Sequence, residues 1–170
     1  MISLKEILSD IQVKKTLTRI SHEIIERHNA LDNIVLVGIL TKGLPIATII
    51  SQNIHKFSGH KIPAFGMDIS AYRDDEKKAN DALLLKAELK DKEVILVDDV
   101  LFTGRSVRAA MDAVMDLGRA QSIELAVLVD RGHRELPIRA DYVGKNIPTH
   151  KQDKIYYDSE KHIVYLKETR

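Results

Sequence analysis

Hydrophobic positions near the start of the chain recur three or four residues apart, and this period predicts an amphipathic helix that ends near Asn29. These positions are Ile7, Leu8, Ile11, Leu17, Ile20, Ile24 and Ile25. A continuous apolar run, 34–37, follows and is closed by Gly38. Such a run is typical of a strand that is buried on both faces. A second helix is expected next, because Pro45 suits a first helical turn and apolar residues continue at helical spacing to Ile54.

The alternation of strands and helices continues along the rest of the chain. The pattern predicts a strand over 63–70, a polar loop over 72–81, a buried strand over 94–97, a helix from Ser106 to Leu117 stopped by Gly118, a strand over 123–129 and a hairpin over 155–165. Strands that alternate with helices predict an α/β fold with a doubly wound, mostly parallel sheet flanked by helices. In such a sheet the ligand site is expected at the carboxyl ends of the strands.

Composition indicates one folded unit. The chain has 170 residues, 44% of them hydrophobic, which suits one substantial core and a single domain over 1–170. It has no cysteine, so disulfides and thiolate chemistry are excluded. No signal peptide and no apolar run long enough to span a membrane is evident, which predicts a cytoplasmic protein with no membrane partner.

Net charge gives no reason to expect wholesale nucleic-acid binding, because 26 basic residues nearly balance 25 acidic ones. The charges are unevenly distributed, however. The segment 68–99 is mainly acidic, and the segment 131–154 is mainly basic. The chain is therefore expected to be electrically polarised.

Candidate chemistry concentrates in the segment 94–106, where a buried strand runs into two carboxylates, a small-residue turn and a helix start. Thr103 and Gly104 permit a tight turn whose backbone amides, with those of the following helix, can hold a phosphate group. Asp98 and Asp99 can accept hydrogen bonds from ribose hydroxyls, and their charge favours positive charge that develops at the anomeric carbon. The segment thus predicts a site for a ribose 5-phosphate.

Other interpretations of an acidic pair at a strand end are a solvated pair or a cap on the next helix. A phosphoreceiver domain also groups acids at strand ends, but it lacks the immediate Thr-Gly turn. No Walker A loop is present in the sequence. The complete strand, acid pair, turn and helix context favours the ribose-phosphate site.

Residues 94–106 resemble the phosphoribosyl pyrophosphate (PRPP) signature of the type I phosphoribosyltransferases. The resemblance widens to 16–20, 34–43, 71–75 and 125–148, which are similar to the members of that family that also regulate pyrimidine operons. It implies a small hood beside the sheet. It also implies that Asp98 and Asp99 hold the ribose in catalysis and that the 5-phosphate lies against Val100, Leu101, Phe102, Thr103, Gly104, Arg105 and Ser106.

The same resemblance assigns pyrophosphate binding to Thr41, Lys42 and Gly43. The family more often has arginine at the position of Lys42, so bidentate phosphate contact is lost while the charge remains. Arg73 would lie on a loop that folds over PRPP and protects it from hydrolysis. From the residues alone, an ordinary strand-to-helix turn with an exposed lysine and a surface arginine stay as alternatives.

The implied reaction is displacement of pyrophosphate from PRPP by uracil, which gives UMP. Mg²⁺ is expected on the substrate, held by its oxygens and by water rather than by dedicated protein ligands. Base binding is assigned to Val129, Asp130 and Arg131 at the end of a strand. The alternative is a salvage enzyme without RNA regulation, specific for uracil or for hypoxanthine, guanine or orotate.

A second function follows from the resemblance alone: binding of pyrimidine operon leader mRNA, with UMP or UTP as corepressor, in a homodimer or higher homo-oligomer. The matching positions are Thr18, Arg19, His22, Arg27, His133, Arg134, Arg139 and Lys145. Thr18 and Arg19 lie four and three residues before His22 and share with it a face of the first helix away from its apolar positions. The alternative is a solvated basic face, since the chain has no tryptophan and only three phenylalanines for base stacking.

Overall fold

The computed structural model of the protein describes residues 2–73 and 89–169. Its elements in chain order are β1 (Ile2–Leu8), α1 (Asp10–Arg27), the 3₁₀ turn η1 (Leu31–Asn33), β2 (Ile34–Ile39), α2 (Gly43–Ser58), β3 (Ala64–Met67), α3 (Ser70–Arg73), β4 (Glu93–Leu101), α5 (Arg105–Leu117), β5 (Ser122–Asp130), β6 (Tyr142–Asn146), β7 (Lys154–Asp158) and β8 (Ile163–Thr169). The predicted polar loop falls partly on α3, and its part over 74–81 lies outside the described residues.

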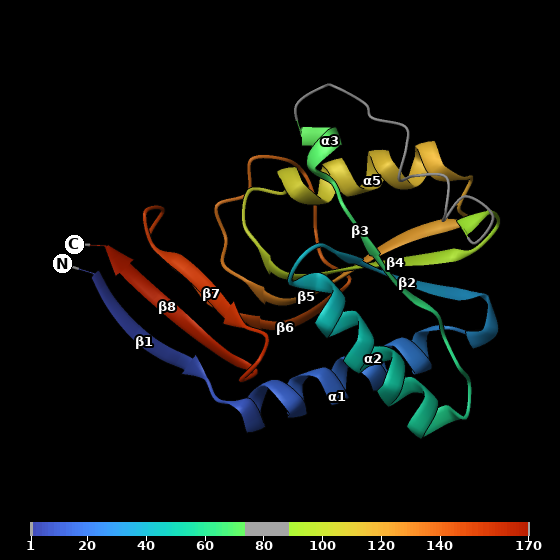
Figure 1. The fold of residues 1–170 in the computed structure, drawn as a ribbon, viewed down its shortest axis with the longest axis horizontal. Helices are drawn as coiled ribbons and strands as arrows, with labels where there is room; N and C mark the ends of the chain where they lie inside the picture. The colour runs from blue at the N-terminus through green and yellow to red at the C-terminus, as the bar shows by residue number, and fades with distance from the viewer. Residues whose placement is uncertain (1, 74–88, 170) are drawn as a thin grey trace.

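The central sheet has five parallel strands in the order β3-β2-β4-β5-β6. Helices α1 and α2 cover one face and α5 covers the other (Figure 1). Successive residues of the strands enter opposite cores: Leu36 packs with the α1 and α2 side, whereas Val35 and Val37 pack with the α5 side. The predicted doubly wound parallel sheet is confirmed.

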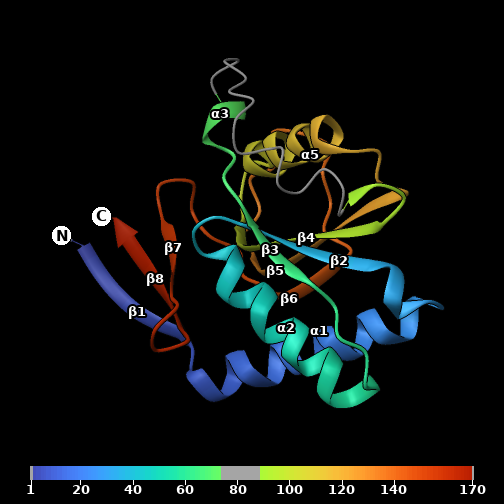
Figure 2. The same ribbon diagram turned by 45° about the vertical axis from the view of Figure 1, so that its right-hand side comes forward.

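A second sheet stands beside the first and forms the hood. It has three antiparallel strands in the order β1-β8-β7, and the two chain termini lie next to each other at one end of the paired strands β1 and β8 (Figures 1 and 2). The hairpin predicted near the end of the chain is confirmed as β7 and β8. Leu8, Tyr157 and Val164 of this sheet join the same core cluster as residues of α1 and α2.

The start of the chain corrects the prediction of one long helix. Ile7 and Leu8 belong to β1, which pairs with β8, and α1 begins only after Ser9. Ser9 forms a capping box with Gln12: its hydroxyl accepts from the Gln12 amide at 3.2 Å, and the Gln12 side chain accepts from the Ser9 amide at 2.8 Å. Ile11, expected to face inward, is exposed.

Strand β6 was not predicted, because Gly144, Lys145 and Asn146 give it no continuous apolar run. It is an edge strand paired on one side with β5.

The strand order fixes where a ligand site lies. From β2 the chain continues to β3 on one side, and from β4 it continues to β5 on the other. In open α/β sheets such a reversal leaves a crevice at the carboxyl ends of the two central strands. The loops after β2 and β4 therefore meet at the crevice. Within residues 2–73 and 89–169, no helix is long and apolar enough to cross a membrane.

Replacing Ser9 with alanine removes the hydroxyl that accepts from the first turn of α1. We expect Ser9→Ala to lower the free energy of unfolding by about 1 kcal/mol, measured by urea denaturation. Ser3→Ala, at an exposed position of β1, is the matched control and should change stability by less than about 0.5 kcal/mol. Equal stability of the two variants would contradict a structural role for the capping box.

Candidate active site

The two predicted carboxylates lie at the end of β4, at the crevice. Asp98 is buried and Asp99 is half-buried. Asp98 accepts a hydrogen bond from the Asp99 amide at 2.8 Å, and Asp99 accepts one from the Val100 amide at 2.8 Å. Each carboxylate is thus held by the backbone of the next residue. A carboxylate fixed in this way is oriented before any ribose arrives.

The loop after the acid pair has the geometry expected for phosphate binding. Gly104 has φ +94°, a backbone conformation that is strained for any residue with a side chain, and it lies directly before α5. No side chain caps this helix, and the Thr103 hydroxyl accepts from the Arg105 amide at 3.3 Å. The start of α5 therefore presents backbone amides toward the loop, as an anion requires. Ser106 lies in the same first turn.

The predicted pyrophosphate loop lies against the acid pair. Gly43 begins α2, and a Cβ atom on it would collide with the carbonyl oxygen of Val97, the residue before Asp98. Only glycine permits the loop after β2 to approach β4 this closely. The peptide bond between Leu40 and Thr41 is cis. Thr41 is exposed and Lys42 is half-buried at the mouth of the crevice.

The hood supplies residues to this region that the sequence did not identify. Tyr157 of β7 is buried, and its hydroxyl shares a hydrogen bond of 2.9 Å with Nδ1 of His162. Burial, with the nearby charges of Asp99 and Asp158, raises the pKa of Tyr157 to about 12. The phenol therefore stays protonated near neutral pH, beside the acid pair.

Arg131, for which base binding is predicted, is buried, and protein groups surround its guanidinium. Its guanidinium carbon lies 3.9 Å from the centre of the Phe102 ring. The same guanidinium donates to the Thr149 hydroxyl at 3.1 Å and to the His150 carbonyl at 2.9 Å. Burial lowers the pKa of Arg131 from its usual value, while the buried Asp153 carboxylate opposes that shift. Arg131 thus connects the loop after β4 to the segment that leads into β7.

Arg134 is a second internal connection. It donates to Asp130 at 2.6 Å, to the Phe102 carbonyl at 2.8 Å and to the Ile138 carbonyl at 2.9 Å. Of the other two predicted base contacts, Asp130 also accepts from the Gly132 amide at 3.0 Å, and Val129 is fully buried in the core. The side chains at the end of β5 are therefore engaged inside the protein.

One of the predicted RNA positions of α1, Arg19, contacts β6 although more than a hundred residues separate the two segments. Arg19 donates to the carbonyls of Val143 and Gly144, at 3.1 and 2.6 Å. Arg27 pairs with Glu124 and Asp141, at 3.1 and 3.5 Å. Thr18 donates to the Lys14 carbonyl at 2.9 Å, and Lys145 is exposed on β6. Arg19 and Lys145 are thus brought close together at the sheet edge, since Arg19 contacts the residue that precedes Lys145.

His22 has a partner that sequence reasoning missed. Its ring stacks on Phe57 of α2, with the centroids 4.3 Å apart and the planes 25° apart. Both residues are exposed, and the Lys56 ammonium lies 5.6 Å from the Phe57 centroid. His133 lies apart from this pair, beside the 5-phosphate loop, where its ring packs edge-on against Phe102 at 5.8 Å. In the sequence, Phe57 stands between the polar residues Lys56 and Ser58 near the end of a predicted helix, and this was the available indication that it has a surface role.

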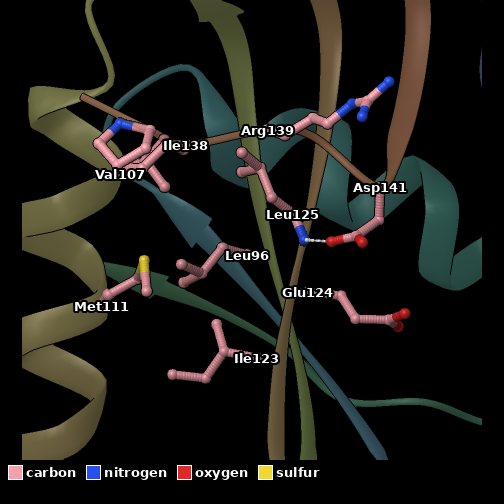
Figure 3. A pocket seen from close by; sticks show the side chains of 10 residues that line it. Leu96, Val107, Met111, Ile123, Glu124, Leu125, Ile138, Arg139 and Asp141 are labelled. Atoms are coloured by element: carbon pink, nitrogen blue, oxygen red, sulfur yellow. Dashed lines mark hydrogen bonds between the residues drawn. The ribbon is translucent and has the colours of Figure 1, made fainter. Parts of the chain in front are cut away.

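A cavity of about 180 Å³ lies beside α5, and none of its lining residues belongs to the crevice. Figure 3 shows Met111 and Ile123 on its apolar side, while the Arg139 side chain extends away from them. The Asp141 carboxylate accepts from the Leu125 amide at 2.9 Å.

Arg73, the predicted catalytic lid residue, ends α3, and most of the expected lid lies outside the described residues. Within residues 2–73 and 89–169, no group of three histidines, cysteines or carboxylates could hold a metal ion. Asp98 and Asp99 lie at the carboxyl end of β4, and carboxylate oxygens suit Mg²⁺ that is already bound to a substrate.

The parallel sheet, the acid pair followed by a Thr-Gly loop at the strand reversal, and the adjoining hood define the class of type I phosphoribosyltransferases. A hypoxanthine-guanine phosphoribosyltransferase from Bacillus anthracis has the same fold, with a TM-score of 0.73 at 18% identity over 99% of this chain and 100% of that one.

The pattern of the phosphoribosyl transferase domain family matches residues 3–159, and the chain belongs to this family. It is 51% identical to the bifunctional protein PyrR of Clostridioides difficile, over 90% of this chain and 89% of that protein. It is 54% identical to the bifunctional protein PyrR of Enterococcus faecalis, over 92% of this chain and 90% of that protein.

Arg131→Met keeps the length of the side chain but removes the charge that faces Asp153 and the donors to Thr149 and His150. We expect this variant to lower the free energy of unfolding by about 3 kcal/mol, because it leaves a buried carboxylate without its cation. Arg108→Met, at an exposed position of α5, is the control and should lie near the wild type in urea denaturation. Similar unfolding midpoints for both variants would refute the structural role of Arg131.

Proposed function

We propose that the protein transfers the phosphoribosyl group of PRPP to uracil, giving UMP and pyrophosphate, and that it also regulates pyrimidine genes by binding their leader mRNA. The observation that carries the enzymatic part is the meeting of three features at one crevice. They are the backbone-held Asp98 and Asp99, the uncapped start of α5 after Gly104, and the Lys42 loop packed on β4. The similarity to bifunctional PyrR proteins supports both activities.

In the proposed reaction, the 5-phosphate lies on the amides that follow Thr103, and the ribose hydroxyls donate to Asp98 and Asp99. Uracil N1 forms a bond to the anomeric carbon as the bond from that carbon to the pyrophosphate oxygen breaks. Pyrophosphate leaves toward Thr41, Lys42 and Gly43, and the N1 proton is released to water. The carboxylates stabilise the positive charge that develops on the ribose, so catalysis is positioning and electrostatics. Mg²⁺ carried by the substrate would neutralise the leaving pyrophosphate. Arg73 would add a further cation from the lid.

Uracil itself would lie near the end of β5, between that strand and the hood. Because the side chains of Asp130 and Arg131 are engaged internally, we assign them the task of fixing the backbone near the base. A purine or orotate enzyme would share the PRPP contacts. Identity above 50% to proteins named bifunctional PyrR favours uracil, since the likeness to hypoxanthine enzymes lies in the fold.

Asp99→Asn removes the negative charge while keeping the shape of the side chain. We expect it to weaken PRPP binding between about tenfold and a hundredfold, because a hydrogen bond to a charged group contributes roughly 1.5–3 kcal/mol. Isothermal titration calorimetry with PRPP and Mg²⁺ measures the effect. Asp112→Asn, on the exposed side of α5, is the same chemical change away from the crevice. Unchanged PRPP affinity in Asp99→Asn would overturn the site assignment.

For RNA binding, the supporting observation is that sequence-distant basic positions gather along α1 and β6. The His22 and Phe57 stack adds an exposed aromatic surface of the kind that unpaired bases use. Arg139 and Lys145 are exposed and suited to phosphate contact. His133 and Arg134 lie beside the 5-phosphate loop, where bound UMP or UTP could alter them.

The protein is proposed to act in the cytoplasm, where PRPP, free nucleotides and nascent mRNA are available. A homodimer or higher homo-oligomer would bring two such basic neighbourhoods together and increase the local positive field.

Arg139→Ala removes one exposed cation without touching the crevice. In fluorescence anisotropy titrations with a pyrimidine leader hairpin and UMP, we expect weaker binding and a salt dependence whose slope is lower by about one, as for one lost phosphate contact. Arg108→Ala on α5 is the control. A wild type that binds the hairpin no better than a scrambled RNA at the same salt would contradict the regulatory function and leave a salvage enzyme.

A further inference from the structure

Tyr156 lies between two ammonium groups at the junction of the hood and the crevice. The Lys42 nitrogen is 5.1 Å from the centre of the Tyr156 ring, and the Lys167 nitrogen is 4.8 Å from it. Both distances are within the range of cation–π attraction. The ring is 40% exposed, so it does not serve mainly to fill the core.

Asp158 acts on Lys42 from the same strand. Residues two apart in a strand face the same side, so Tyr156 and Asp158 share one face of β7 while Tyr157 faces the core. The Asp158 carboxylate accepts from the amides of Glu160 and Lys161, at 3.0 and 3.1 Å. These hydrogen bonds, first that of Lys161, lower the pKa of Asp158, and the charges of Lys161 and Lys42 lower it further. An ionised carboxylate and an aromatic face therefore both attract the Lys42 ammonium.

We propose that Tyr156, with Asp158, is a positioning residue that holds the Lys42 ammonium over the pyrophosphate part of the crevice. This inference rests on the proposed phosphoribosyltransferase function and deepens it. A lysine is a point charge on a flexible stem and lacks the rigid fork of arginine. Contacts from the hood limit where the ammonium can go, and they offset the loss of bidentate geometry.

The arrangement also links the two sheets functionally. Lys42 directly precedes α2 on the central sheet, whereas Tyr156 belongs to the smaller sheet (Figure 1). In this proposal, the position of the hood therefore affects the position of the Lys42 ammonium, the charge that meets the leaving pyrophosphate. A different role for Tyr156, stacking on the uracil ring, would alter uracil affinity rather than pyrophosphate affinity.

The test compares Tyr156→Leu, which removes the aromatic face, with Tyr156→Phe, which keeps it. We expect Tyr156→Leu to weaken binding of PRPP and of pyrophosphate, each with Mg²⁺, about two- to fivefold in calorimetry, as an exposed cation–π contact predicts. The KM for uracil should stay unchanged, and Tyr156→Phe should match the wild type. Tyr165→Leu removes the ring of β8 that stacks on Tyr156 at 6.4 Å but leaves Tyr156 itself, so it separates loss of that stack from loss of the cation–π contact.

A double-mutant cycle with Lys42→Met shows whether the effect passes through the lysine. In the Lys42→Met background, adding Tyr156→Leu should cause no further loss of pyrophosphate affinity. Equal losses in both backgrounds, or a raised KM for uracil in Tyr156→Leu, would overturn the proposal. A wild type that binds PRPP and pyrophosphate but shows no uracil-dependent turnover would count against the proposed uracil specificity and leave the Tyr156 effect measurable.

Discussion

The buried guanidinium of Arg131 is the interaction on which the arrangement of the site depends. It packs on Phe102 of the loop after β4 and donates to the 149–151 segment, which leads into the hood. A buried charge is costly unless it is paired and hydrogen-bonded, and Arg131 has both kinds of partner. The loop after β4, the end of β5 and the approach to β7 are therefore fixed relative to one another.

Arg134 extends this connection toward the proposed RNA surface. It is hydrogen-bonded to Asp130 and to the Phe102 carbonyl, next to the 5-phosphate loop, and also to Ile138, next to Arg139. The 130–139 segment therefore connects the loop after β4 to the exposed Arg139.

Local sequence patterns predicted the central sheet well. Ile34–Val37 and Val94–Val97 are continuous apolar runs, and such runs are typical of strands in a parallel sheet that is covered on both faces. The acid pair and the Thr-Gly turn were also predictable, since their chemistry lies within one segment. The boundary between β1 and α1 was missed because Ile7 and Leu8 fit a helical period as well as a strand, although Ser9 and Gln12 mark the helix start.

The parts that sequence reasoning missed depend on distant contacts. Nothing local to Arg131 shows that Thr149 and Phe102 will surround it, and a predicted hairpin does not reveal that Tyr156 will meet Lys42. The stack of His22 on Phe57 likewise joins two helices. Side-chain partners across elements are set by packing in three dimensions, which periodicity along the chain does not contain.

The central claim is that the crevice between β2 and β4 is a PRPP site serving uracil. The most direct measurement is the rate of pyrophosphate release from PRPP and Mg²⁺ by the purified protein with uracil, hypoxanthine, guanine or orotate supplied in turn. The account predicts release with uracil, UMP formed in equal amount, and little release with the other bases. Release with hypoxanthine or guanine but not uracil, or with no base at all, would contradict it.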